Sequence, residues 1–353
     1  MKKKPTVQAS KTKRPTIRQI AAELDLSIAT VSRVINNKPD VNAASRERVI
    51  SYLRSIDYQP PVVSADLGLI GLVDTFQRHD LNSYYVSAIL AGADEQLHRY
   101  KYNVVLIHYD QIESEMMNYG QVTILNRLKG LLWLEPMFSA QHLKIVQDHR
   151  LPCVVLNNSE EGVDVDLVRS DNYHAARRAV AFLVAKGHTR IGFVGGWLHL
   201  ANHRDRLKGY LEGLDAAGIT PDDSIIVKDI VSWDEHGGYE GTNRVVSGTQ
   251  PPTAILLCSD FLASGAYSAM FDLGLRIPDD VSVVSFDDFP LARHMDPPLT
   301  TFRQPLRKMG AQAAGILAER FGTGNGNSAD APVRHELVPC PIITRSSAGP
   351  CPG

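Results

Sequence analysis

The segment of residues 16–36, TIRQIAAELDLSIATVSRVIN, constrains the fold of this chain more than any other stretch. Its apolar residues recur at helical spacing on both sides of a short polar corner, DLS. The pattern predicts two short helices, at residues 18–24 and 28–35, that meet at a tight turn. Thr16 and Ser27 each precede one helix, where a hydroxyl oxygen accepts hydrogen bonds from the first free N–H groups.

The second helix has one apolar face and one exposed face of small side chains. Val31 and Ile35 are predicted to be buried. The exposed face is predicted to carry Ile28, Ala29, Ser32 and Arg33. Such a face fits the major groove of DNA, where arginine donates hydrogen bonds to O6 and N7 of guanine. The alternative interpretation is a helical hairpin within an enzyme.

Three stretches carry a family resemblance: ATVSRVIN, the polar loop at residues 37–40, and VNAASRERVISYLRSIDYQP. They resemble the helix-turn-helix headpiece of the LacI/GalR family of bacterial transcription regulators. The resemblance implies a headpiece at residues 16–59, with a third helix at about residues 43–56 behind the other two.

The headpiece residues divide into base readers and phosphate contacts. We expect Arg33 to read a base directly, whereas Ile28 and Ala29 offer apolar contact, for instance to a thymine methyl group. Phosphate contacts position the protein without specifying sequence. They are predicted for Thr16, Thr30, Ser32, Asn36 and Asn42.

Charge is divided unevenly along the chain, although the net charge is only −2. Residues 1–58 contain 12 Lys and Arg against five Asp and Glu, whereas residues 59–353 carry a net −9. This asymmetry places a phosphate-facing surface at the N-terminus and predicts an acidic body. Residues 1–15 are either a flexible basic arm that attracts phosphates or an inert tail.

The four cysteines, Cys153, Cys258, Cys340 and Cys351, lie far apart and show neither metal-ligand spacing nor a disulfide framework. We therefore expect no bound metal and a reducing cytoplasm. The basic start lacks the apolar stretch of a signal peptide, and no apolar run is long enough to span a membrane.

Beyond residue 61, predicted strands alternate with amphipathic stretches. The strands form two series: 69–74, 103–108, 130–134, 153–157 and 167–170, then 191–195, 225–227, 254–258 and 281–286. This alternation predicts an α/β fold with parallel sheets in two similar lobes. Ligands of such folds bind outside the carboxyl ends of the strands.

Three further stretches resemble the effector domain of the same family: AFLVAKGHTRIGFVGG, PTAILLCSDFLASGAYSAM and GLRIPDDVSVVSFDDFPLARHMDPPLTTFRQP. The resemblance implies a two-lobed periplasmic-binding-protein-like domain at residues 69–345, followed by a tail at 346–353. Lobe 1 is expected at about 69–171 and 302–325, and lobe 2 at about 172–301 and 331–345. The chain should cross between lobes near 170–172, near 300–304 and within 322–333.

The resemblance also implies a ligand site between the lobes. Its predicted residues are Tyr84, Tyr85, Asn157, Arg206, Trp233, Ser259, Asp260 and Asp287. One of the two tyrosines should face the cleft and the other the core. Asp260 is alternatively a cap of the helix beginning at residue 261, and Trp233 is alternatively a core residue.

The linker departs from the family pattern. Only nine residues, PVVSADLGL, separate Pro60 from Ile70, which leaves room for one short helical turn around Leu67 in a hinge at residues 60–68. Family members place a hinge helix there, whose leucine enters the minor groove.

The sequence contains no Gly-x-Ser-x-Gly elbow, Walker loop or His-Glu-x-x-His motif, so we predict a non-enzyme that needs no cofactor. We predict a repressor that reads a pseudo-palindromic operator as a homodimer and responds to a small effector, favouring a sugar. A purine or nucleoside corepressor is the alternative effector. A ligand-binding module without DNA control and a sugar- or nucleoside-processing enzyme are alternative functions.

Overall fold

The computed structural model describes residues 15–35, 41–56, 68–74, 84–119, 124–134, 138–157, 162–322 and 332–353. The chain divides into two compact units, Met1–Ala65 and Asp66–Gly353. In the described residues, no helix combines the length and the apolar character that crossing a membrane requires.

The described residues of the first unit form three helices, α1 (Ile17–Glu23), α2 (Ile28–Ile35) and α3 (Ala43–Ser55), as the sequence predicts within one residue at each end. Their shared core consists of Ile20, Ala21, Val31, Val34 and Val49. The prediction for Ile35 is wrong in detail, because Val34 is buried beside Val31 and Ile35 only borders the core.

Local hydrogen bonds define the start of α1 and the start of α2. The hydroxyl of Thr16 accepts from the Gln19 N–H, and the Gln19 side chain accepts from the Thr16 N–H, which completes a capping box. The Ser27 hydroxyl accepts from the Thr30 N–H at 3.0 Å. Asp25 adopts a positive φ of 49° at the turn, a conformation that aspartate tolerates better than most residues.

The second unit is built on two six-stranded sheets, which confirms the predicted α/β class. The first sheet has the order β11 (His335–Val338), β5 (Asp166–Ser170), β4 (Cys153–Leu156), β3 (Gly130–Leu134), β1 (Leu69–Asp74) and β2 (Asn103–His108). All its neighbouring strands are parallel.

The second sheet repeats this plan with an antiparallel edge. Its order is β12 (Ile342–Ile343), β10 (Thr300–Arg303), β9 (Ser282–Asp287), β8 (Ala254–Leu257), β6 (Ile191–Val194) and β7 (Ile226–Val227). The pairing of β10 with β12 is antiparallel, and the other pairs are parallel.

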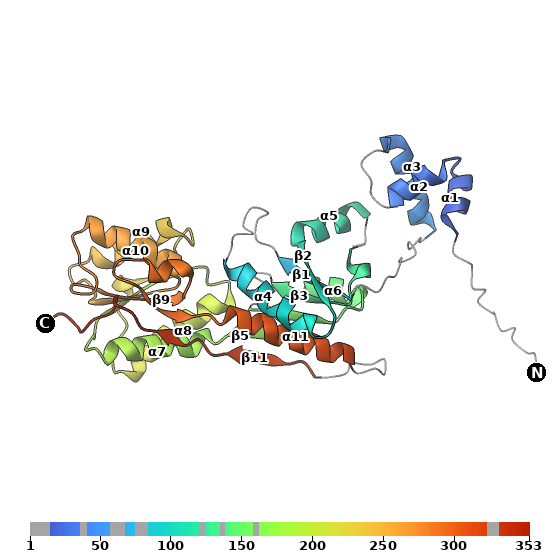
Figure 1. Cartoon of the computed structure of the whole chain (residues 1–353). Coiled ribbons are helices and arrows are strands. Elements are labelled where there is room, and N and C mark those ends of the chain that lie inside the picture. Colours follow the sequence, from blue (N-terminus) through green and yellow to red (C-terminus); the bar gives the residue numbers. More distant parts are fainter. Residues whose placement is uncertain are drawn as a thin grey trace, which may run out of the picture. The chain divides into compact units, whose positions relative to one another are not determined.

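Helices cover the sheets in packed pairs. In the first lobe, α4 (Tyr84–His98) packs against α11 (Leu306–Gly322), and the two lie side by side in Figure 1. In the second lobe, α7 (Asn172–Val184) packs against α8 (Ala201–Ala216), and α9 (Glu235–Val246) against α10 (Asp260–Asp272). The first lobe also carries α5 (Tyr109–Tyr119) and α6 (Ala140–Asp148).

The chain passes between the sheets at three places. The first lies between β5 and α7, and the second between β10 and α11. The third lies between β11 and β12, so the prediction that it falls within residues 322–333 is wrong. Residues 335–338 pair with β5 in the first sheet instead of joining the second lobe. They form an edge strand whose first three residues are exposed, so they lack the apolar pattern of a buried strand.

The last residues also differ from the expected tail. The buried Ser347 hydroxyl donates to the Val283 carbonyl at 2.6 Å, and the Cys351 N–H donates to the Lys186 carbonyl at 2.9 Å. Residues 346–353 therefore pack against the second lobe.

Close approach of α4 and α11 predicts a steric effect that can be measured. A Cβ added at Gly92 would lie 1.9 Å from the Arg307 carbonyl oxygen, whereas one added at Gly315 would meet only the Gln96 side chain at 3.7 Å. We expect Gly92→Ala to lower the free energy of unfolding by about 1–3 kcal/mol. Gly315→Ala should leave it unchanged or raise it, because alanine favours helix. Urea denaturation measures both, and equal effects would contradict the steric account.

Candidate functional site

The predicted reading face lies on the exposed side of α2. Ile28 is 50% exposed, Ala29 and Arg33 are exposed, and Ser32 is half-buried, whereas Val31 and Val34 face the core. Thr30 is partly buried, and its hydroxyl lies 2.8 Å from that of Ser27. Ile28, Ala29, Ser32 and Arg33 therefore lie on the side of α2 that faces away from the headpiece core.

Two predicted phosphate contacts serve as helix caps. Thr16 caps α1, and the Asn42 side chain accepts from the N–H groups of Ala44 and Ser45 at 2.8 and 3.2 Å at the start of α3. Both caps are exposed, at helix N-termini whose dipoles attract phosphate. Asn36 and the linker, including Leu67, lie outside the described residues.

In the second unit, Arg206 and Asp287 form a buried ion pair at the carboxyl edge of the second sheet. Arg206 is 1% and Asp287 5% exposed, and their Nη2 and Oδ1 atoms lie 3.4 Å apart. The guanidinium also donates to the Cys258 carbonyl and lies over the Phe286 ring. Burial raises the pKa of the Asp287 carboxyl, and the Arg206 charge opposes this rise.

Asp287 and Asp288 have different partners. Both have positive φ, 115° and 56°, at the end of β9. Asp288 pairs with Arg303 and Arg345, each at 2.6 Å. Only Asp287 joins Arg206, so the two carboxylates do not form an acid/base pair on one site.

The first lobe contributes Tyr85 to this polar centre. Burial raises the pKa of its phenol, and the charges of Asp287 and Asp74 raise it further while that of Arg206 lowers it. Tyr85 also packs against the core of the first lobe. Tyr84 is 47% exposed and contacts the Phe289 ring edge-on at 5.7 Å between centroids.

Asn157 lies at the carboxyl end of β4 with a positive φ of 71°. It is 3% exposed, and neither polar atom of its amide has a hydrogen-bond partner among the described residues. An unpaired buried amide is costly. This cost is offset when a bound molecule supplies the missing hydrogen bonds.

Ser259 and Asp260 have structural roles in this conformation. Ser259, rather than Asp260, caps α10 by accepting from the Leu262 N–H at 3.1 Å. The buried Asp260 carboxylate accepts from the hydroxyls of Ser285 and Thr301 and from the Phe289 N–H. Asp260 therefore holds the loop after β9, and the alternative that it caps the helix is wrong.

Trp233 belongs to an aromatic cluster that the sequence analysis missed. The His203 ring stacks on it at 4.0 Å with an interplanar angle of 6°, and the Trp197 ring lies 5.6 Å away. Trp197 is 41% exposed and follows β6. Its position just after a predicted strand could have marked it as a candidate site residue. Burial, with the Arg206 charge, lowers the pKa of His203 to about 3.

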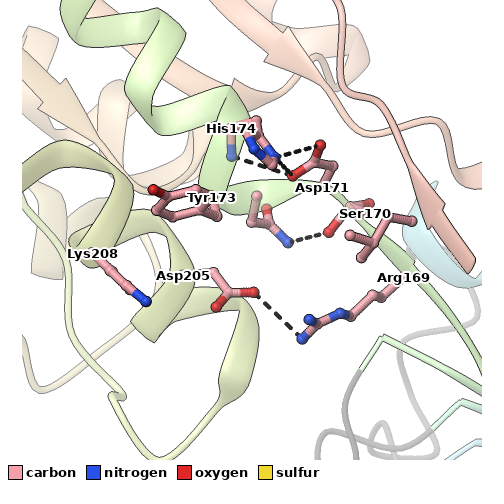
Figure 2. A pocket seen from close by; sticks show the side chains of 9 residues that line it. Arg169, Ser170, Asp171, Tyr173, His174, Asp205 and Lys208 are labelled. Carbon is pink, nitrogen blue, oxygen red and sulfur yellow. Dashed lines mark hydrogen bonds and ion pairs between the residues drawn. The ribbon is translucent and has the colours of Figure 1, made fainter. Parts of the chain in front are cut away.

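A small pocket lies at the first chain crossing (Figure 2). Arg169 and Ser170 of β5, Leu337 of β11, and residues of α7 and α8 line it. Across it, Arg169 and Asp205 form an ion pair at 3.5 Å. None of the predicted ligand residues lines this pocket. Among the described residues, no group of three His, Cys, Asp or Glu side chains is arranged to hold a metal ion.

Asp260 predicts a dependence of stability on pH. Burial raises its pKa to about 8, and the Asp287 charge adds to the rise. An unfolded aspartate has a pKa of about 3.9. At pH values between about 4 and about 8, the Asp260 side chain is ionised mainly in the unfolded chain. The free energy of unfolding should therefore fall as pH rises through this range.

We expect the melting temperature of Asp260→Asn to fall less steeply with pH over this window than that of the wild type. Asp279→Asn, which changes an exposed carboxylate, should keep the wild-type slope. The raised pKa of Asp260 is contradicted if the melting temperatures of the wild type, Asp260→Asn and Asp279→Asn change with pH in the same way.

Each of the two units resembles known proteins. Residues 16–61 match the family model "Bacterial regulatory proteins, lacI family", and residues 180–348 match "Periplasmic binding protein-like domain". The chain is 26% identical to the HTH-type transcriptional repressor PurR of Pasteurella multocida, over 92% of this chain and 97% of that protein.

The ribose operon repressor of Haemophilus influenzae is 30% identical, over 88% of this chain and 93% of that protein. The solved complex of the transcriptional regulator CelR with cellobiose superposes with a TM-score of 0.69 at 26% identity, covering 95% of this chain and 100% of that one. With this agreement across both units, the chain belongs to the lacI family of bacterial regulatory proteins.

Proposed function

We propose that this protein is a homodimeric transcriptional repressor whose affinity for a pseudo-palindromic operator is controlled by a small sugar bound between the lobes. The observation that carries the proposal is the pairing, in one chain, of an exposed reading face on α2 with the buried Arg206–Asp287 centre. A reading helix without a ligand site would give a constitutive regulator. The ligand site without the headpiece would give the alternative, a binding module without DNA control.

DNA reading is assigned to α2. Arg33 is proposed to donate to a guanine, and Ile28 and Ala29 to provide apolar contact in the major groove. Thr16, Thr30, Ser32, Asn36 and Asn42 are proposed phosphate contacts that set the position of the helix. Two headpieces of a dimer would then read two half-sites of opposite orientation.

A sugar matches the ligand centre better than a purine does. Sugar hydroxyls both donate and accept, which suits the Asp287 carboxylate, the Arg206 guanidinium and the unpaired amide of Asn157. The C–H face of a sugar also packs on tryptophan, which Trp233 and the exposed Trp197 provide. The names of two similar proteins, a ribose operon repressor and a regulator solved with cellobiose, point the same way. A purine or nucleoside remains the second candidate, because its ring would stack on the same aromatic cluster.

Arg33→Ala tests the reading helix. We expect it to weaken binding to a selected operator by about 1–3 kcal/mol and to relax the preference at one base pair. Gel shifts on operator and scrambled duplexes measure the effect. Arg18→Ala removes the same charge from an exposed position on α1, so it should weaken binding to both duplexes alike. The role of Arg33 is contradicted if its variant behaves like the Arg18 variant.

A thermal-shift screen with ribose, cellobiose and free purines tests the ligand class. Specific binding raises the melting temperature, because only the folded protein binds the ligand. At a ligand concentration of 100 times Kd, binding raises the free energy of unfolding by about 2.7 kcal/mol. We expect a sugar to produce this rise in the wild type and in Asp279→Asn, and to produce none in Asp287→Asn. A rise with a purine alone would replace the sugar by the second candidate.

A further inference from the structure

Five buried polar residues form a closed ring of hydrogen bonds in the second unit. They come from three stretches that are far apart in the sequence: the passage from β5 to α7, helix α8, and β9 with the segment after β10. Each residue is 9% exposed or less. The members are Ser170, Asn172, Arg206, Asp287 and Gln304.

One half of the ring runs from the ion pair to the first crossing. The Arg206 Nε donates to the Asn172 Oδ1 at 2.8 Å, and the Asn172 Nδ2 donates to the Ser170 carbonyl at 3.2 Å. Asn172 therefore uses both ends of its amide, and it lies where β5 of the first lobe passes into α7 of the second.

The other half runs from the ion pair to the second crossing. The Gln304 Nε2 donates to the Asp287 Oδ1 at 2.6 Å, and the Ser170 hydroxyl donates to the Gln304 Oε1 at 3.1 Å. Gln304 lies between β10 of the second lobe and α11 of the first. Because Ser170 closes both halves, the two crossings are joined to each other and to the ion pair.

We propose that Asn172 and Gln304 are positioning residues that orient Arg206 and Asp287 and tie this pair to two of the three chain crossings. The inference rests on the proposed function only where it treats Arg206 and Asp287 as ligand contacts. A ligand hydroxyl that bonds to the Asp287 Oδ1 competes with the Gln304 amide for the same oxygen. Occupation of the site then changes the bonds at both crossings directly.

The crossings have amides that report on the ring. The Asp171 N–H donates to the Val338 carbonyl at 2.9 Å, and the Gln304 N–H donates to the Asp287 carbonyl at 3.2 Å. Val338 ends β11, immediately before the third crossing. Exchange of these two amides with solvent measures local opening at the first and second crossings.

Hydrogen exchange on the full-length protein without ligand tests the ring. We expect Gln304→Ala to speed exchange near Asp171 by about three- to tenfold, and Asn172→Ala to speed exchange near Gln304 by a similar factor, as loss of one or two hydrogen bonds implies. The milder Ser170→Ala should speed both, and its retained fold is checked by melting temperature.

Asp205→Asn is the matched control. It removes the Arg169–Asp205 ion pair, which also joins the lobes at the first crossing but lies outside the ring (Figure 2). It should leave exchange near Gln304 unchanged. The proposal is overturned if each ring variant changes only its own crossing, or if Asp205→Asn changes the second crossing as much as Asn172→Ala does.

A second readout uses ribose and cellobiose as probes. A sugar that raises the wild-type melting temperature should alter exchange at both crossings of the wild type. In Asn172→Ala it should alter the first crossing less than in the wild type, because only the Gln304–Ser170 bond then links that crossing to the ion pair. Identical changes in both proteins would overturn the positioning role. If neither probe binds, the sugar assignment fails while the ligand-free exchange still decides the ring, so the two failures are distinguishable.

Discussion

The ion pair between Arg206 and Asp287 is the interaction on which the second unit depends. Burying two charges costs several kcal/mol per ion unless other groups satisfy them. Here the Cys258 carbonyl, the Asn172 amide and the Gln304 amide supply those bonds, and the Phe286 ring covers the guanidinium. The pair therefore requires β8, β9, α7 and α8 to meet at one edge of the second sheet. Removal of either charge would leave the other buried and uncompensated.

Most buried polar side chains at this centre have hydrogen-bond partners within the protein, and a few have none among the described residues. In the second lobe, the polar groups of Arg206, Asp287 and Asp260 have partners within the protein. In the first lobe, the Asn157 amide has none among the described residues. The buried Nδ1 of His203 in the second lobe also has no partner among the described residues. If Asn157 contacts a ligand as proposed, the ligand would supply the hydrogen bonds that its amide lacks.

Local signals were enough to predict the headpiece helices, because their caps and apolar spacing lie within a few residues of each other. Most strands of both sheets were also recognisable, since buried parallel strands are continuous apolar runs, but β10, β11 and β12 were not predicted. The third crossing was misplaced because β11 is a largely exposed edge strand without such a run. The three bonds of Asp260 join it to residues 25 to 41 positions away, which spacing along the sequence does not reveal.

The bonds of the ring limit the chemistry of a ligand that enters it. An anion placed near the Asp287 oxygen would be repelled by that carboxylate, whose cationic partner, Arg206, already donates to the Asn172 and Cys258 oxygens. A cation near Arg206 would meet the guanidinium and the neutral His203 ring, which offers no compensating charge. A neutral polyol avoids both repulsions, because each hydroxyl donates to Asp287 or accepts from Arg206 as its rotation requires. The electrostatics of this centre therefore favour a neutral ligand rich in hydroxyl groups.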